Sequence, residues 1–117
     1  MVFNHDEEHV DESMVLVQAN LDDMNPEFST RVSDRLFEYG AHDVYWIPIM
    51  MKKGRPGIML NVLTSRERLE QIKTVIFEET TTLGLRYWDT SCHRLGRQWV
   101  KVKTEWGIVN VKIGIYQ

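Results

Sequence analysis

The alternation of hydrophobic and polar positions divides this chain into short extended segments and two helical ones. Runs rich in β-branched and aromatic residues, either apolar throughout or alternating with polar residues, predict β-strands. Near the C-terminus, alternation on both sides of Glu105-Trp106-Gly107 predicts a tight hairpin. The strands predicted in this way are residues 14–20, about 42–50, 58–63, 85–90, 97–105 and 107–115.

Two segments between these strands show the helical period. Their apolar residues recur three and four positions apart, which places them in one stripe along a helix. Asn25 followed by Pro26 is a typical helix start, and Gly40 is a typical helix end. Ser65 caps the second predicted helix and Gly84 ends it. The two stripes are Phe28, Val32, Leu36 and Tyr39, and Leu69, Ile72, Ile76 and Thr80.

The order of these elements, β-α-β-β-α-β followed by a β-hairpin, predicts an α+β fold. It is the ferredoxin-like arrangement, in which both helices cover one face of an antiparallel sheet. We expect residues 1–13, which are acidic and show no periodicity, to form a disordered lead. Residues 14–117 are expected to form a single domain. The chain stops within an apolar pattern at residues 113–117, so we expect a fragment of a longer protein.

The composition is that of an ordinary soluble globular domain, with 43% hydrophobic and 26% charged residues among 117. No apolar run approaches the roughly 18 residues of a membrane span, and no secretory signal opens the chain. The single cysteine, Cys92, excludes an internal disulfide and fits a reducing cytoplasm. Of the 17 acids, five lie in residues 1–12, which leaves 12 acids against 14 bases in the rest. This weakly positive body suits a small anionic ligand rather than duplex nucleic acid.

Residues 50–57 carry the most informative chemistry. Lys52, Lys53 and Arg55 are interspersed with two glycines, Gly54 among them, directly after an apolar segment. Glycine lets backbone N–H groups approach an anion, and the cationic side chains neutralise it, as binding of a polyphosphate requires. The alternative is a solvated hairpin turn, since the segment lacks the P-loop pattern and no helix follows it.

Asp22 and Asp23 lie between a strand end and a helix start. A triphosphate normally arrives with a divalent metal, and paired carboxylates supply the oxygen ligands that such a metal needs. The alternative is that these acids cap the following helix and compensate its dipole.

Thr80 and Thr81 stand at the predicted end of the second helix, and Arg86 follows Gly84. Three consecutive threonines extend a helix poorly, and hydroxyl groups at a helix end can contact phosphate or ribose. The alternative is a frayed helix end whose threonines satisfy its own carbonyl groups. No catalytic nucleophile is evident, because the chain shows no Ser-His-Asp set and no cysteine pair.

Three segments taken together resemble one protein family. Residues 19–27 (ANLDDMNPE), 48–57 (PIMMKKGRPG) and 79–86 (ETTTLGLR) are similar, in this order and spacing, to the C-terminal domain of the LarC family. Proteins of this family insert nickel during nickel-pincer nucleotide biosynthesis. The resemblance covers about residues 14–114. Family proteins are longer, with another domain ahead of this one and a His-rich acidic junction that residues 5–9 resemble.

The resemblance implies a CTP-dependent nickel insertase, a cyclometallase of the chelatase (lyase) type. It would insert nickel into a pyridinium bis-thiocarboxylate mononucleotide and so form the nickel-pincer cofactor of lactate racemase. The use of CTP suggests cytidylyl activation of the substrate phosphate, with Mg²⁺ or Mn²⁺ assisting. Ligands for nickel itself cannot be placed on this chain.

The resemblance also implies residue roles and partners. The expected metal ligands are Asp22 and Asp23, and the expected CTP and phosphate ligands are Lys52, Lys53, Gly54, Arg55, Thr80, Thr81 and Arg86. Expected partners are the N-terminal part of the same protein and further copies of this chain, and also the sulfur-insertion enzyme and the lactate racemase of the pathway. No nucleic acid or membrane is expected.

A non-catalytic homo-oligomerisation module is the alternative function. Ferredoxin-like sheets have open edges and one bare face, and the aromatic strands of this chain suit burial between subunits. RNA binding on the sheet is disfavoured, because the paired aromatic signature of RNA-recognition modules is missing.

Overall fold

The computed structural model describes residues 7–116, and the chain divides into two compact units. One unit is Ser13–Thr90, and the other combines Met1–Glu12 with Ser91–Gln117. This differs from the expected single domain over residues 14–117. Within the described residues, no helix is both long and apolar enough to cross a membrane.

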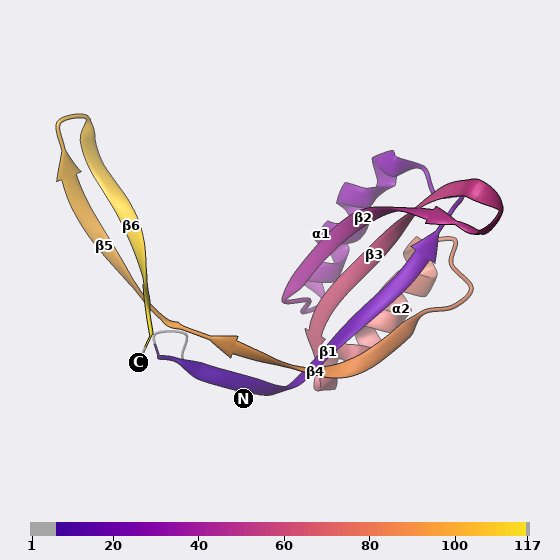
Figure 1. Cartoon of the computed structure of the whole chain (residues 1–117), viewed down its shortest axis with the longest axis horizontal. Helices are drawn as coiled ribbons and strands as arrows, with labels where there is room; N and C mark the ends of the chain where they lie inside the picture. Colours follow the sequence, from indigo (N-terminus) through magenta and orange to yellow (C-terminus); the bar gives the residue numbers. More distant parts are fainter. Residues whose placement is uncertain (1–6, 117) are drawn as a thin grey trace. The chain divides into compact units, whose positions relative to one another are not determined.

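The unit Ser13–Thr90 is built on a four-stranded sheet with the strand order β2-β3-β1-β4, and both helices cover one of its faces (Figure 1). The pairs β1–β3 and β2–β3 are antiparallel. The predicted α+β class and element order are therefore confirmed. The elements are β1 (His9–Leu21), α1 (Ser29–Glu38), β2 (Asp43–Met51), β3 (Arg55–Ser65), α2 (Leu69–Glu79) and β4 (Arg86–Arg94), with short 3₁₀ turns at Pro26–Phe28, Lys52–Gly54 and Arg66–Arg68.

The core lies between the sheet and the two helices. From Val15 to Leu21, every second residue of β1 packs into the core against the helices, as the two-residue period of a strand requires. The predicted helix stripes are buried at their centres, whereas Phe28 and Tyr39 at the ends of the first stripe are 50% and 40% exposed. The core residues are Val15, Val17, Ala19, Leu21, Val32, Leu36, Leu60, Val62, Leu69, Ile72, Val75 and Ile76.

The helix starts and ends follow local hydrogen bonding. The Asn25 side chain accepts a hydrogen bond from the Glu27 N–H at 3.0 Å, so the predicted cap is present, and Gly40 has a φ of 103° where the first helix ends. The prediction that Gly84 ends the second helix is wrong. Thr80 is already extended, and its hydroxyl donates to the Ile76 carbonyl at 2.7 Å, which satisfies the helix end earlier.

The prediction of a disordered lead over residues 1–13 differs from the structure from His9 onward, where β1 begins. The Asp11 side chain is buried and accepts a hydrogen bond from Arg94 Nε at 2.9 Å. The segment is part of strand β1, which is hydrogen-bonded to β4 in the sheet. Residues 1–6 lie outside the described part of the chain.

The C-terminal hairpin pairs β5 (Gly96–Thr104) with β6 (Gly107–Ile115), as predicted. Cross-strand partners lie on the same face, so the register defines two unlike faces. One face carries only uncharged side chains, most of them β-branched. The other pairs Trp99 with Lys112 and Lys103 with Ile108, and also carries Lys101.

We expect Gly57→Ala to lower the free energy of unfolding by about 1–3 kcal/mol. A Cβ atom at Gly57 would lie 2.9 Å from the Leu21 carbonyl oxygen, which belongs to the neighbouring strand and cannot move aside easily. Gly84→Ala is the matched control, because no atom lies within 4 Å of its added Cβ. Urea denaturation measures both, and equal stability of the two variants would contradict the close approach.

Candidate functional site

The residues between β1 and the first helical turn separate two hollows in the unit Ser13–Thr90. Asp22 lines a hollow of about 240 Å³, and Asp23 lines a second one of about 420 Å³. Met24 lines both. The two neighbouring carboxylates that the sequence singled out therefore belong to different hollows.

The first hollow is mostly apolar. Trp46 of β2 forms part of its wall and is held in place by a hydrogen bond from its indole N–H to Ser33 Oγ at 2.8 Å. Trp46 is not among the site residues predicted from the sequence, and nothing in the apolar pattern of its strand marked it as lining a hollow. The full lining is Leu21, Asp22, Met24, Pro26, Ser29, Trp46, Pro56, Gly57 and Ile58.

The second hollow joins the loop after β1 to the end of α2. Thr81 Oγ1 donates a hydrogen bond to Asp23 Oδ1 at 2.5 Å, across 58 residues of sequence. Thr80 also lines this hollow, so three of the predicted site residues meet here. The lining is Asp23, Met24, Asn25, Phe28, Arg31, Val32, Glu78, Glu79, Thr80 and Thr81.

The carboxylates of the second hollow differ in their partners. Glu79 forms ion pairs with Arg31, at 3.6 Å, and with Arg35, which also lies 3.6 Å from Glu78. The Tyr39 hydroxyl, followed by the Glu79 carboxylate, raises the pKa of Arg35, so this guanidinium stays charged. Within residues 7–116, Asp23 is the carboxylate of this hollow that has no basic partner.

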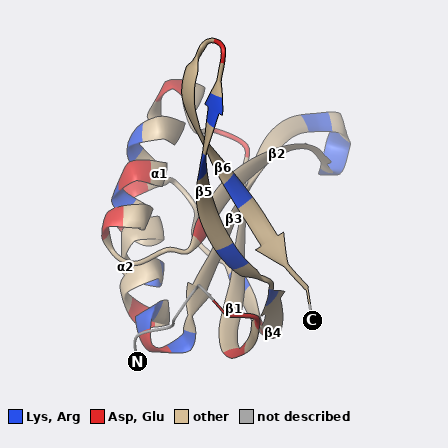
Figure 2. Ribbon diagram, turned by 90° about the vertical axis from the view of Figure 1, so that its left-hand side faces the viewer, with Lys and Arg blue, Asp and Glu red and all other residues tan. Residues whose placement is uncertain are grey.

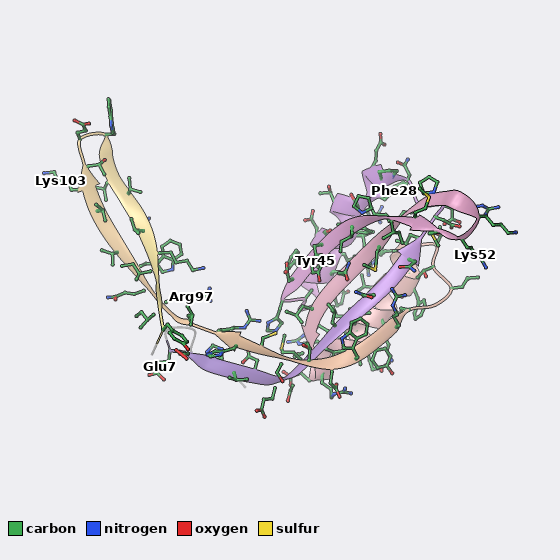
Figure 3. The ribbon with its side chains drawn as sticks, in the orientation of Figure 1. Glu7, Phe28, Tyr45, Lys52, Arg97 and Lys103 are labelled. Carbon is green, nitrogen blue, oxygen red and sulfur yellow. The ribbon has the colours of Figure 1, made fainter. Side chains whose placement is uncertain are left out.

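The predicted basic segment forms the turn between β2 and β3. Lys53 and Gly54 have φ values of 61° and 68°, a left-handed conformation that is unfavourable for lysine and free for glycine. Figure 2 shows the lysine and arginine residues gathered at this turn, and in Figure 3 the Lys52 side chain extends outward from its tip. The three cationic side chains line neither hollow, but Pro56 and Gly57 at the base of the turn line the first one.

Arg86 lies apart from both hollows. Its Nε donates to Gln18 Oε1 at 3.1 Å, and the Gln18 amide donates to Asn61 Oδ1 at 2.7 Å. Val17 and Ala19 face the helices, so Gln18 between them faces the other side of the sheet. The sequence analysis did not predict this amide pair. Its signal in the sequence is a polar residue inside each of two largely apolar strands, Gln18 in β1 and Asn61 in β3.

The donors around Asp22 and Asp23 are carboxylate and hydroxyl oxygens, which suit Mg²⁺ or Mn²⁺. Within residues 7–116, no group of three or more His, Cys, Asp or Glu side chains is arranged to hold a metal. Magnesium commonly takes only one or two carboxylates and completes its shell with phosphate oxygens and water. The site therefore fits a metal that arrives with a phosphate ligand.

Two curated relatives of this chain have the same description. A protein of Clostridium kluyveri is 50% identical over 94% of this chain, and one of Clostridium acetobutylicum is 46% identical over 91%. Both are described as pyridinium-3,5-bisthiocarboxylic acid mononucleotide nickel insertion proteins. The chain spans about a quarter of the length of these relatives, since it covers 27% and 25% of them.

Solved structures show the same fold. A structure described as LarC2, the C-terminal domain of a cyclometallase involved in the synthesis of the NPN cofactor of lactate racemase, is 35% identical. It matches with a TM-score of 0.86 over 94% of this chain and 74% of that one. A protein of Methanopyrus kandleri, 23% identical over 92% of this chain and 67% of that one, matches with a TM-score of 0.68 and shows likeness of fold alone. The family model for the nickel insertion protein matches residues 1–117, and this chain therefore belongs to that family, as its three motifs indicated.

Proposed function

We propose that this chain binds CTP together with Mg²⁺ or Mn²⁺ as part of a longer nickel insertion protein. That protein inserts nickel into a pyridinium bis-thiocarboxylate mononucleotide and so forms the nickel-pincer cofactor of lactate racemase. The family match and the names of the relatives support this assignment. We place the activity in the cytoplasm and treat nickel as a substrate, with no ligand to it assigned on this chain.

The observation that carries the nucleotide assignment is the placement of Asp23. Two threonines lie beside it in the second hollow, and the neighbouring glutamates are already paired with arginines. A carboxylate without a basic partner attracts a cation, and hydroxyl groups beside it suit phosphate or sugar oxygens. A volume of about 420 Å³ lies within the usual range for small-molecule sites.

The step that we infer is cytidylyl transfer. A phosphate oxygen of the mononucleotide bonds to the α-phosphorus of CTP, the bond between this phosphorus and the β-phosphate oxygen breaks, and pyrophosphate leaves. Such a transfer depends on positioning and charge neutralisation and needs no protein nucleophile.

Most of the predicted site residues take a part in this transfer. Asp22 and Asp23 hold the metal when it is bound, and the basic turn neutralises the departing pyrophosphate. Thr80 and Thr81 position phosphate or sugar oxygens. The part of Arg86 stays a prediction, because it lies on the other face of the sheet.

We expect Asp23→Asn to weaken Mn²⁺-dependent CTP binding by about tenfold or more, since a neutral amide keeps the Thr81 hydrogen bond but loses the attraction for the metal. Calorimetric titration with CTP and with ATP, each with Mn²⁺ and with EDTA, measures this. Glu67→Gln is the matched control, because Glu67 is exposed and lines neither hollow. Equal CTP affinity in both variants would remove Asp23 from the site.

The basic turn has its own test. Lys53→Ala and Arg55→Ala should each reduce CTP affinity about tenfold, because each loses one charge-assisted contact to phosphate. Lys101→Ala, on the C-terminal hairpin, is the control and should leave the affinity unchanged. Unchanged affinity in both turn variants would exclude the turn from binding.

A second candidate function, homo-oligomerisation, is favoured by the C-terminal hairpin. One of its faces carries six β-branched aliphatic residues and no charge, and four of them are 38–49% exposed. An isolated two-stranded ribbon is only marginally stable in water, so this face is suited to burial against a second copy. The six residues are Val100, Val102, Val109, Val111, Ile113 and Ile115.

We expect Val109→Glu to dissociate such an oligomer, because it places a charge in the aliphatic face. Ile108→Glu is the matched control, since Ile108 is 71% exposed and lies on the opposite, basic face. Light scattering with and without CTP measures the mass of each variant. A monomeric unsubstituted chain, or equal masses for the two variants, would argue against this function.

A further inference from the structure

We propose that a third hollow, at the base of the C-terminal hairpin, binds the phosphate group of a small anionic ligand. This hairpin hollow has a volume of about 220 Å³ and lies where β4 passes into β5, beside β6. Its residues belong to the unit that contains Ser91–Gln117, and none of them lines either hollow of the unit Ser13–Thr90. The lining is Arg94, Leu95, Gly96, Arg97, Lys112 and Gly114.

The charge of the hairpin hollow suits an anion. Among the residues that the structure describes, three cationic side chains and no acidic one line it. Arg94 is already neutralised, because its Nε donates to the buried Asp11 carboxylate at 2.9 Å. Arg97, at the base of the hairpin in Figure 3, is half-buried, and no carboxylate of the described chain forms an ion pair with it. A charge that is partly withdrawn from water is costly without a partner, and an anion in the hollow supplies that partner.

The register of the hairpin brings a second cation within reach of the same anion. Arg97 lies opposite Gly114, and the next pair on this face is Trp99 with Lys112. Arg97 and Lys112 are therefore diagonal neighbours, and such neighbours are about 7–8 Å apart, within reach of long side chains. The Lys112 ammonium group lies over the Trp99 ring, 5.8 Å from its centre. A phosphate group between the two cations can accept charge-assisted hydrogen bonds from both.

Gly114 provides the room for the anion, because it faces Arg97 across the hairpin without a side chain. Its φ is not positive, so its backbone conformation does not require glycine. A Cβ atom placed on it would lie 3.5 Å from Leu95 Cδ1, which is an ordinary contact. The backbone therefore accommodates a larger residue here, and the missing side chain keeps the hollow open.

The size and charge of the hairpin hollow favour a single phosphate group. A volume of about 220 Å³ is below the usual range of about 300–1,000 Å³ for pockets that hold a whole small ligand. A phosphate group carries close to two negative charges near neutral pH and so matches the two cations that lack an acidic partner. A carboxylate carries one charge and would neutralise only one of them.

The test is a titration of the ¹⁵N-labelled chain with inorganic phosphate in EDTA, near neutral pH and at constant ionic strength. EDTA removes the divalent metal that the proposed nucleotide site needs. The Arg97 Nε–H signal reports on the hairpin hollow and is identified by its loss in Arg97→Lys. We expect this signal to shift saturably, with about tenfold weaker affinity for acetate, which has a single charge. No saturable shift, or equal affinity for the two anions, would overturn the proposal.

Lys112→Ala and Gly114→Val should each weaken phosphate binding about tenfold. The first removes a charge, and the second fills the hollow while both cations stay in place. Lys101→Ala and Asn110→Val are the matched controls, since these two residues pair farther along the same face and do not line the hollow. Backbone amide spectra check that the hairpin forms in each variant. Unchanged affinity in both test variants, or an equal loss in the controls, would overturn a discrete site.

Glycerol 3-phosphate distinguishes the two sources of a phosphate group. Affinity equal to that of inorganic phosphate assigns the hairpin hollow to a phosphate ester, whereas severalfold weaker binding of the ester assigns it to the free ion. The proposal does not depend on the nucleotide site, so Asp23→Asn should leave the phosphate titration at Arg97 unchanged. An equal loss of phosphate affinity in Asp23→Asn would overturn the hairpin hollow as the site.

Discussion

The apolar layer between the sheet and the two helices is the constraint on which the rest of the structure depends. Val17, Ala19 and Leu21 of β1 are buried against residues such as Leu36 and Ile76 of the helices. Removal of such side chains from water is the main favourable term in folding. This layer fixes the ends of β1 and α2 relative to each other, which is why Thr81 reaches Asp23 across 58 residues of sequence.

The same sheet presents a different chemistry on its other face. Gln18 and Asn61 are register partners on β1 and β3 and satisfy each other by a hydrogen bond, so the fully buried Asn61 is not left without a partner. Arg86 bonds to this pair. The two hollows beside Asp22 and Asp23 therefore lie on the helix side of the sheet. Arg86 is hydrogen-bonded on the other side and does not reach them.

The acidic residues of the second hollow differ in whether a basic side chain neutralises them. Glu79 is 13% exposed in its side chain and is paired with two arginines, Arg31 and Arg35. Asp23 keeps a hydroxyl partner only, within the described residues. An acid that is already neutralised by arginine has little remaining attraction for a metal, so partner choice rather than residue type sets the available charge.

The sequence by itself determined the element order, the Asn25 helix cap, the buried helix stripes and the basic turn, because each depends on neighbours within a few residues. Tertiary structure alone decided that Asp22 and Asp23 belong to different hollows and that Arg86 turns to the other face. It also decided that Asp11 is buried against Arg94, 83 residues away. These outcomes depend on contacts between residues far apart in the chain, and such contacts leave no periodic pattern in the sequence.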